Sequence, residues 1–185
     1  VASGTTGCGG TKHMKPVDPA GMSAMYDSIN PNEAAIVFFR PWGFMGSALN
    51  PGIVEVDESG NLKFVAIMPN GTRYIHRTTP GKHTYFWSSV SLHGGLVSCI
   101  LVADMEAGKT YYTAAFGSKD FTPVTDTSDE TFVKNLNSCS WIENTPDGQI
   151  WFNGNLPSLQ NKYTQAIGKG AMLIKPEYGT ITSVR

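Results

Sequence analysis

Short runs of apolar and alternating residues fill the chain from residue 34 to residue 117, and turn-forming residues separate them. The run Ala34–Arg40 is almost wholly apolar and is closed by Pro41, which indicates a buried strand. Later runs are separated by turn signals at Gly60, Asn70-Gly71, Pro80-Gly81 and Gly108. Because turns that recur about every 8–12 residues are typical of a β-sandwich, we predict about seven strands over residues 34–117.

Each turn signal is interpreted as the loop of a hairpin between the runs on either side of it. The first hairpin, around Gly60, sets Glu55 opposite Lys63 as a cross-strand ion pair. The second turns at Asn70-Gly71, the strongest short hairpin signal, because both central positions of its turn need positive φ. The last turns at Gly108 and pairs the runs before and after it.

The hairpin around Pro80-Gly81 gathers aromatic side chains on one face of the predicted sheet. These side chains are Tyr74, His76, Tyr85 and Trp87, and the same register places Thr78 opposite His83. The aromatic row is either half of a packed sheet interface or an exposed platform for a partner, and the pattern leaves both open. Lys82 and His83 are interpreted as turn residues that point to water, because no glycine-rich helix N-terminus is near to hold an anion.

Two helices are predicted in the C-terminal part. Thr127–Glu130 resembles a capping box, which predicts a short helix that ends near Leu136. Pro157–Ile167 predicts a second helix, because proline favours a first helical position and Gly168 follows its end. Thr145–Gly148 is interpreted as a turn between two short strands, and a last strand is expected over residues 171–175. The chain is thus divided into an extended arm at 1–33, a β-sandwich domain at 34–125 and a small α+β extension at 126–185.

Composition excludes several classes of function. The chain of 185 residues has a net charge of −1 and no run of like charges, whereas a nucleic-acid surface needs clustered lysine and arginine. No stretch approaches the roughly 18 apolar residues of a membrane helix, so membrane contact is expected only through a lipid anchor upstream of Val1. The histidines and cysteines share no short spacing of the kind that marks zinc sites. We therefore expect no nucleic acid, no metal and no cofactor.

No catalytic residues are predicted. The sequence lacks a Gly-x-Ser-x-Gly nucleophile elbow. The paired carboxylates Asp57-Glu58 and Asp129-Glu130 fall in a predicted hairpin turn and a predicted helix cap, which explains them without catalysis. Of the three cysteines, Cys8 lies in the arm, so Cys99 and Cys139 are the pair expected if one disulfide forms, although Cys99 is also predicted to stand opposite Ala115 in an apolar strand.

Five motifs resemble a family of small bacterial envelope proteins, often lipoproteins, catalogued as domain of unknown function 2846. The motifs are Ala35–Pro41, Gly46-Ser47, Asn70–Tyr74, Pro80–Thr84 and Ala107–Tyr112, spread in that order over about half of the chain. The resemblance implies an immunoglobulin-like or transthyretin-like β-sandwich that a bacterium exports. It implies no catalytic residues, because the family has none established.

The sequence therefore predicts a non-enzymatic structural or interaction subunit of a bacterial cell-envelope or extracellular assembly, located in the periplasm, at the outer membrane or outside the cell. Other protein subunits, copies of this chain among them, are the expected partners. Binding is expected through the segments 1–33 and 140–185, which carry apolar residues that a sandwich does not need. The alternative is a carbohydrate-binding module that uses exposed aromatic rings, with Trp141 and Trp151 added to the aromatic row.

Overall fold

Strands account for most of the elements in the computed structural model, which describes residues 12–18, 22, 30–43, 50–89, 99–116, 120–170 and 172–174. The strands are β1 Met14–Pro16, β2 Ala34–Arg40, β3 Pro51–Val56, β4 Leu62–Ile67, β5 Thr72–Thr78, β6 Gly81–Ser89, β7 Cys99–Met105, β8 Thr110–Phe116, β9 Asp120–Pro123, β10 Ser140–Asn144 and β11 Met172–Ile174. The helices are α2 Glu130–Asn137 and α3 Pro146–Gly168. The predicted mainly β class is confirmed.

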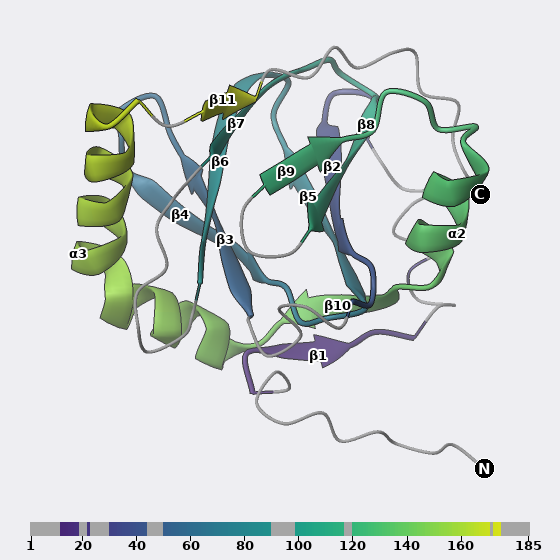
Figure 1. The fold of residues 1–185 in the computed structure, drawn as a ribbon, viewed down its shortest axis with the longest axis horizontal. Helices are drawn as coiled ribbons and strands as arrows, with labels where there is room; N and C mark the ends of the chain where they lie inside the picture. Colours follow the sequence, from purple (N-terminus) through teal and green to yellow (C-terminus); the bar gives the residue numbers. More distant parts are fainter. Residues whose placement is uncertain are drawn as a thin grey trace.

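The strands form two sheets that pack face to face, with a helix on the outer side of each (Figure 1). In the described residues the larger sheet has the order β1-β10-β5-β2-β8-β9 and the smaller sheet the order β11-β7-β6-β3-β4. Helix α2 covers the larger sheet and α3 the smaller sheet. The architecture is a β-sandwich with a helix on either side.

Apolar side chains fill three layers, because both faces of the central strands are covered. Phe38 and Tyr85 meet edge to face between the two sheets, with ring centroids 5.4 Å apart. Phe132 of α2 packs on Phe39 across the outer face of the larger sheet, at 5.7 Å between centroids. Phe152 of α3 belongs to the third layer, on the smaller sheet. Burial on both faces is the reason that β2 is apolar almost throughout its length.

The first predicted hairpin is confirmed. Strands β3 and β4 pair antiparallel, and Glu55 stands opposite Lys63 as expected. Gly60 supplies the positive φ of the connecting loop, at 81°. The predicted ion pair between Glu55 and Lys63 is not formed. Lys63 Nζ instead lies 3.7 Å from Asp57 Oδ2, and the Glu55 carboxylate contacts two histidines.

The other three predicted hairpins are wrong. The turns at Asn70-Gly71, Pro80-Gly81 and Gly108 each carry the chain from one sheet to the other. Strand β5 pairs with β2, and β2 pairs in parallel with β8. Residues expected as neighbours in one sheet therefore face each other across the interior, and the rings of His76 and Tyr85 lie 5.9 Å apart there. A turn reverses the chain locally, but burial of both strand faces decides in which sheet the next strand lies.

The C-terminal helices differ from their predictions in where they begin. Helix α2 is confirmed, although its N-cap is Asp129, whose carboxylate accepts a hydrogen bond from the Phe132 amide. Helix α3 begins at Pro146, so the predicted turn at residues 145–148 is its first turn. Pro157, predicted to start this helix, lies inside it, and the helix bends along the smaller sheet (Figure 1). It ends at Gly168, one residue beyond the predicted end at Ile167.

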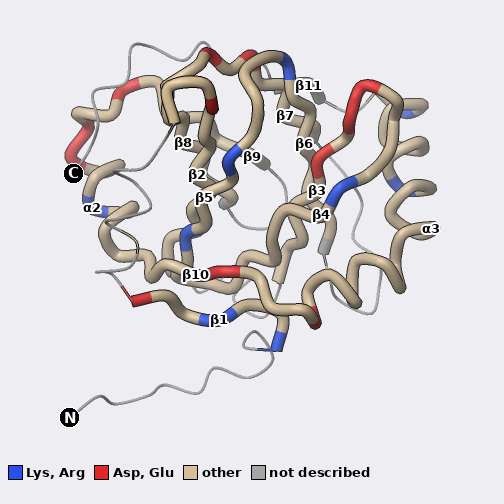
Figure 2. The backbone as a smooth tube through the Cα atoms, turned by 180° about the vertical axis from the view of Figure 1, so that it is seen from behind, with Lys and Arg blue, Asp and Glu red and all other residues tan. Residues whose placement is uncertain are grey.

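The described parts of the two terminal segments pack on their own chain. Strand β1 extends the larger sheet beside β10 (Figure 2), and Met14 is 2% exposed in the layer between the sheets. Helix α3 covers the smaller sheet. In the described residues β1, β10 and α3 thus pack on their own chain, while most of the arm lies outside the described residues. That the two segments bind neighbouring chains stays a prediction. Neither helix in the described part of the chain is long and apolar enough to cross a membrane.

Candidate functional site

The aromatic residues predicted as an interaction surface lie mostly inside the molecule. Tyr85 and Trp87 are 0% and 5% exposed in the layer between the sheets. Trp141 is 6% exposed beneath α2. The half-buried members of the set are Tyr74, His76 and Trp151. The aromatic row is therefore core, which decides between the two interpretations that the pattern left open.

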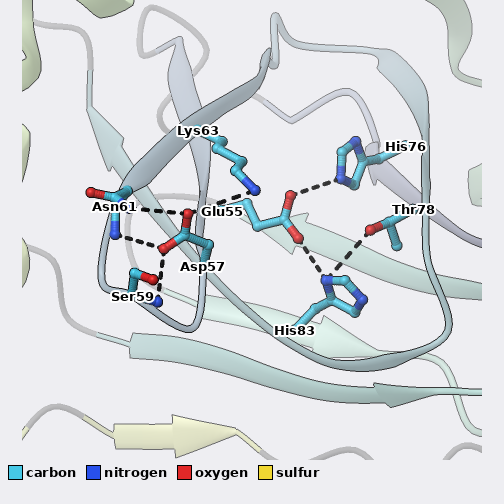
Figure 3. A network of polar contacts seen from close by, with 8 residues as sticks. All are labelled: Glu55, Asp57, Ser59, Asn61, Lys63, His76, Thr78 and His83. Atoms are coloured by element: carbon cyan, nitrogen blue, oxygen red, sulfur yellow. Dashed lines mark hydrogen bonds and ion pairs between the residues drawn. The ribbon is translucent and has the colours of Figure 1, made fainter.

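Three titratable side chains meet between the sheets, near the turns that follow β3 and β5 (Figure 3). Glu55 comes from β3, His76 from β5 and His83 from β6, and we call them the Glu–His cluster. Glu55 Oε2 lies 3.2 Å from His76 Nε2, and Glu55 Oε1 lies 2.6 Å from His83 Nδ1. The three side chains are only 10%, 17% and 12% exposed, respectively. One carboxylate thus joins histidines from both sheets.

The hydrogen bonds of His83 define its charge. Nε2, the second ring nitrogen, lies 2.8 Å from the carbonyl oxygen of Thr79. A carbonyl oxygen and an ionised carboxylate only accept hydrogen bonds, so both His83 nitrogens must carry hydrogen. His83 is therefore the imidazolium cation, paired with the Glu55 carboxylate. The prediction that His83 points to water is wrong, whereas Lys82 beside it is exposed.

The electrostatics of the Glu–His cluster favour this charged pair. Burial acts to raise the pKa of the Glu55 carboxyl, but the hydrogen bonds and charges of His76 and His83 outweigh it and lower that pKa to about 2. The hydrogen bond to Glu55 raises the pKa of His83 above its ordinary value, against the effect of burial, which lowers it. Both shifts extend the pH range in which the pair is ionised.

The arrangement does not fit nucleophilic catalysis. Thr78 Oγ1 approaches His83 at Nδ1, 3.5 Å away, which is the nitrogen that Glu55 already binds. In a catalytic triad the carboxylate and the hydroxyl bind opposite nitrogens of the histidine, and here Nε2 is held by the Thr79 carbonyl. No group of three or more His, Cys, Asp or Glu side chains in the described ranges is arranged to hold a metal ion. The Glu–His cluster is therefore an internal ion network.

One large aromatic side chain in the described part of the chain extends into solvent. Trp42 is 71% exposed, whereas the other three tryptophans are buried or half-buried. It lies in residues 41–43, which directly follow β2. The Asn70 side chain holds this loop, because its Nδ2 donates to the Gly43 carbonyl at 3.0 Å and its Oδ1 accepts from the Gly43 amide at 3.1 Å. Asn70 thus fixes the backbone next to Trp42.

The disulfide expected between Cys99 and Cys139 is not formed, because Cys139 is a free thiol. Cys139 is 3% exposed, and its Sγ lies 3.3 Å from the carbonyl oxygen of Asn135. It belongs to the layer between α2 and the larger sheet, whereas Cys99 begins β7 of the smaller sheet and pairs with Met172, not with Ala115. The sandwich separates the two residues, and burial raises the pKa of the Cys139 thiol.

Sequence reasoning missed the Glu–His cluster because it placed Glu55 and the two histidines in separate hairpins. The sequence did indicate one contact of the cluster. The register predicted around the Pro80-Gly81 turn placed Thr78 opposite His83, and the two side chains do lie close together. The hydrogen bonds between Asn70 and the Gly43 backbone next to Trp42 join residues 27 positions apart, so no local pattern indicates them.

Comparison of the chain with family models, with curated proteins and with solved structures finds no match. The resemblance drawn from the five sequence motifs stays a prediction.

Proposed function

We propose that this chain is a non-enzymatic interaction domain of a bacterial cell-envelope or extracellular assembly, and that Trp42 anchors it to another protein. The observation that carries the proposal is the 71% exposure of Trp42. A large apolar ring in water forgoes the stabilisation that burial supplies. Tryptophan is also enriched among the few residues that dominate the energy of protein–protein interfaces.

The loop around Trp42 is suited to binding because it is already held in place. Asn70 makes two hydrogen bonds to the Gly43 backbone, and the Arg40 carbonyl accepts a hydrogen bond from the Gly71 amide at 2.9 Å. A Cβ atom on Gly71 would lie 3.5 Å from Trp42 Cδ1, so the indole rests close to the Gly71 backbone. A backbone that is held in place before binding loses less conformational entropy when the partner arrives, which favours affinity.

The carbohydrate-binding alternative is less well supported. It needs several exposed rings in a row, and the candidates Tyr85, Trp87 and Trp141 are at most 6% exposed. The other exposed large apolar residues of the described chain are the aliphatic side chains Ile150, Leu156 and Ile167 of α3. Among the described residues Trp42 is the one exposed ring, and a single indole fits an anchor for a protein pocket better than a platform for a sugar chain.

Within the sandwich class, the strand order differs from that of the immunoglobulin constant-type fold. In an immunoglobulin constant-type sandwich the first two strands share a sheet. Here β2, the first strand of the sandwich domain, lies in the larger sheet, and β3 lies in the smaller one. The bacterial envelope setting rests on the sequence motifs described above.

A photo-crosslinking experiment tests the proposal directly. A benzophenone amino acid replaces Trp42 in the full chain, expressed in its native cells, and the same residue replaces Ile150, which is 64% exposed on α3, as the control. We expect one discrete protein adduct from position 42 and none of that mass from position 150. An adduct of twice the mass of the chain identifies a second copy as the partner. No adduct at position 42, or the same adducts at both positions, would overturn the proposal.

A stability control separates binding from folding. Because Trp42 is mostly exposed, Trp42→Ala should leave the unfolding midpoint almost unchanged while it abolishes assembly in sedimentation velocity of the native complex.

A further inference from the structure

The Glu–His cluster is an ionic contact inside an otherwise apolar layer. Most residues around it in that layer are apolar. The Tyr85 ring lies beside both histidines, with its centroid 6.2 Å from that of His83 and 5.9 Å from that of His76. His76 belongs to the larger sheet, while Glu55 and His83 belong to the smaller one. The cluster therefore connects the sheets at the end where the chain crosses between them at Pro80-Gly81.

We propose that Glu55, His76 and His83 form a pH-sensitive latch, which holds this end of the two sheets together in mildly acidic solution and loosens above neutral pH. The inference concerns the interior of the fold and is independent of the partner that Trp42 binds.

The latch depends on the second proton of His83. When His83 is an imidazolium, it donates to Glu55 on one side and to the Thr79 carbonyl on the other. The neutral ring has one N–H, so one of these acceptors then loses its donor. If the hydrogen stays at Nε2, a lone pair at Nδ1 faces a carboxylate 2.6 Å away, which is repulsive. If it stays at Nδ1, the Thr79 carbonyl is released and the turn into β6 loosens.

Other polar groups facing the latch set its balance. Lys63 of β4 stands opposite Glu55, and the positive charge of Lys63 lowers the pKa of His83. Asp57 forms an ion pair with Lys63 and partly offsets this charge. Thr78 adds a hydroxyl 3.5 Å from His83 Nδ1. On β7 the residue opposite His83 is the apolar Ala103. His76 Nε2 lies 3.2 Å from Glu55 Oε2 on the side of the larger sheet.

Tyrosines complete the surroundings of the latch. Tyr74 precedes His76 on the same face of β5, and burial raises its pKa, so its hydroxyl stays neutral through the range considered. Tyr85 lies opposite Glu55 on β6, and Tyr111 of β8 shares the apolar layer.

The two ionisations define a window of pH. The folded pKa of Glu55 is lowered from 4.5 to about 2, so its contribution is complete above pH 4.5 and is lost as the pH falls through about 2. The folded pKa of His83 is raised from 6.5, so its contribution is complete below pH 6.5 and is lost as the pH rises through the raised value. The latch is therefore complete between pH 4.5 and pH 6.5.

The first experiment measures the free energy of unfolding by urea from pH 3 to pH 9 for the wild-type chain, Glu55→Gln, and Glu143→Gln as the control. Glu143 is a half-exposed glutamate on β10, 2.7 Å from exposed Lys15, and its replacement should leave the pH profile unchanged. We expect the wild-type ratio of folded to unfolded chain to fall on the alkaline side by about tenfold for each pH unit by which the folded pKa of His83 exceeds the unfolded value. Glu55→Gln should abolish this fall. A wild-type profile that matches Glu55→Gln from pH 5 to pH 8 would refute the latch.

The second experiment needs only the wild-type chain, so it decides the matter even if Glu55→Gln does not fold. Nitrogen NMR of the histidine rings should show hydrogen on both nitrogens of His83 at pH 6. Hydrogen exchange of amides 81–84 should become faster above neutral pH than the intrinsic pH dependence explains. A neutral His83 ring at pH 6, or exchange that follows the intrinsic rate throughout, would contradict the proposal.

Discussion

Replacing Gly148 by alanine tests how closely β1 is docked against the start of α3. Gly148 is buried in the first turn of the helix. A Cβ atom there would lie 2.9 Å from the carbonyl oxygen of His13 and 3.0 Å from Cε1 of Phe64. The His13 carbonyl accepts a hydrogen bond from the Thr145 amide at 3.1 Å, so it cannot move away without weakening that bond. The Phe64 ring is held against Trp151 and Phe152.

Two effects of opposite sign compete in Gly148→Ala. Alanine stabilises a helix interior by up to about 1 kcal/mol relative to glycine, and the gain is smaller in a first turn. Overpacking a tight site costs roughly 1–3 kcal/mol, since backbone and ring must both shift. We therefore expect Gly148→Ala to lower the free energy of unfolding by about 1–2 kcal/mol.

Gly154 in the same helix is the matched control. It is exposed, and a Cβ atom there has nothing within 4 Å. Gly154→Ala should therefore stabilise the chain by up to about 1 kcal/mol. Urea unfolding followed by circular dichroism gives both values, and hydrogen exchange of the Thr145 amide should be faster in Gly148→Ala alone. Equal stabilisation by the two variants would refute the close docking of β1.

Two further predictions concern local contacts of α2. Asp129→Ala removes the carboxylate that accepts from the Phe132 amide at 2.8 Å, so urea unfolding should show a loss of about 1 kcal/mol. An unchanged midpoint would mean that this cap does not stabilise the helix. Because Cys139 is buried and burial raises the pKa of its thiol, iodoacetamide should label it in the native chain far more slowly than in urea. Peptide mass mapping checks the rate, and a native Cys139 peptide linked to Cys99 would contradict the free thiol.

Several features were predictable because they depend on chemistry within a few residues. The apolar run of β2 and the turn at Gly60 indicated a buried strand and a hairpin, and the β3–β4 register followed from the loop length. The end of α3 was predicted to within one residue of Gly168. A capping residue or a positive-φ glycine acts on its own neighbours, so the sequence pattern is enough to locate it.

The Asn70-Gly71 turn was predicted from the local sequence, but the pairing of the strand that follows it was not. Turn chemistry requires only that the chain reverse, which it does whether the next strand pairs with the last one or crosses to the opposite sheet. Here β5 finds its partners in β2 and β10, and Asn70 instead binds Gly43. The choice depends on apolar residues from distant strands that must be buried on both faces of each sheet, and no local signal carries that information.

The Glu–His cluster exists for the same reason. Glu55 was expected to face Lys63 in a hairpin, and His83 was expected to point to water. The crossing at Pro80-Gly81 places β5 and β6 in opposite sheets, so His76 and His83 converge on Glu55 from both sides. Once the carboxylate is removed from water, its charge must be compensated by partners from whichever strands face it. The two histidines compensate this charge because the packing of the two sheets, which depends on residues far apart in the sequence, places them next to Glu55.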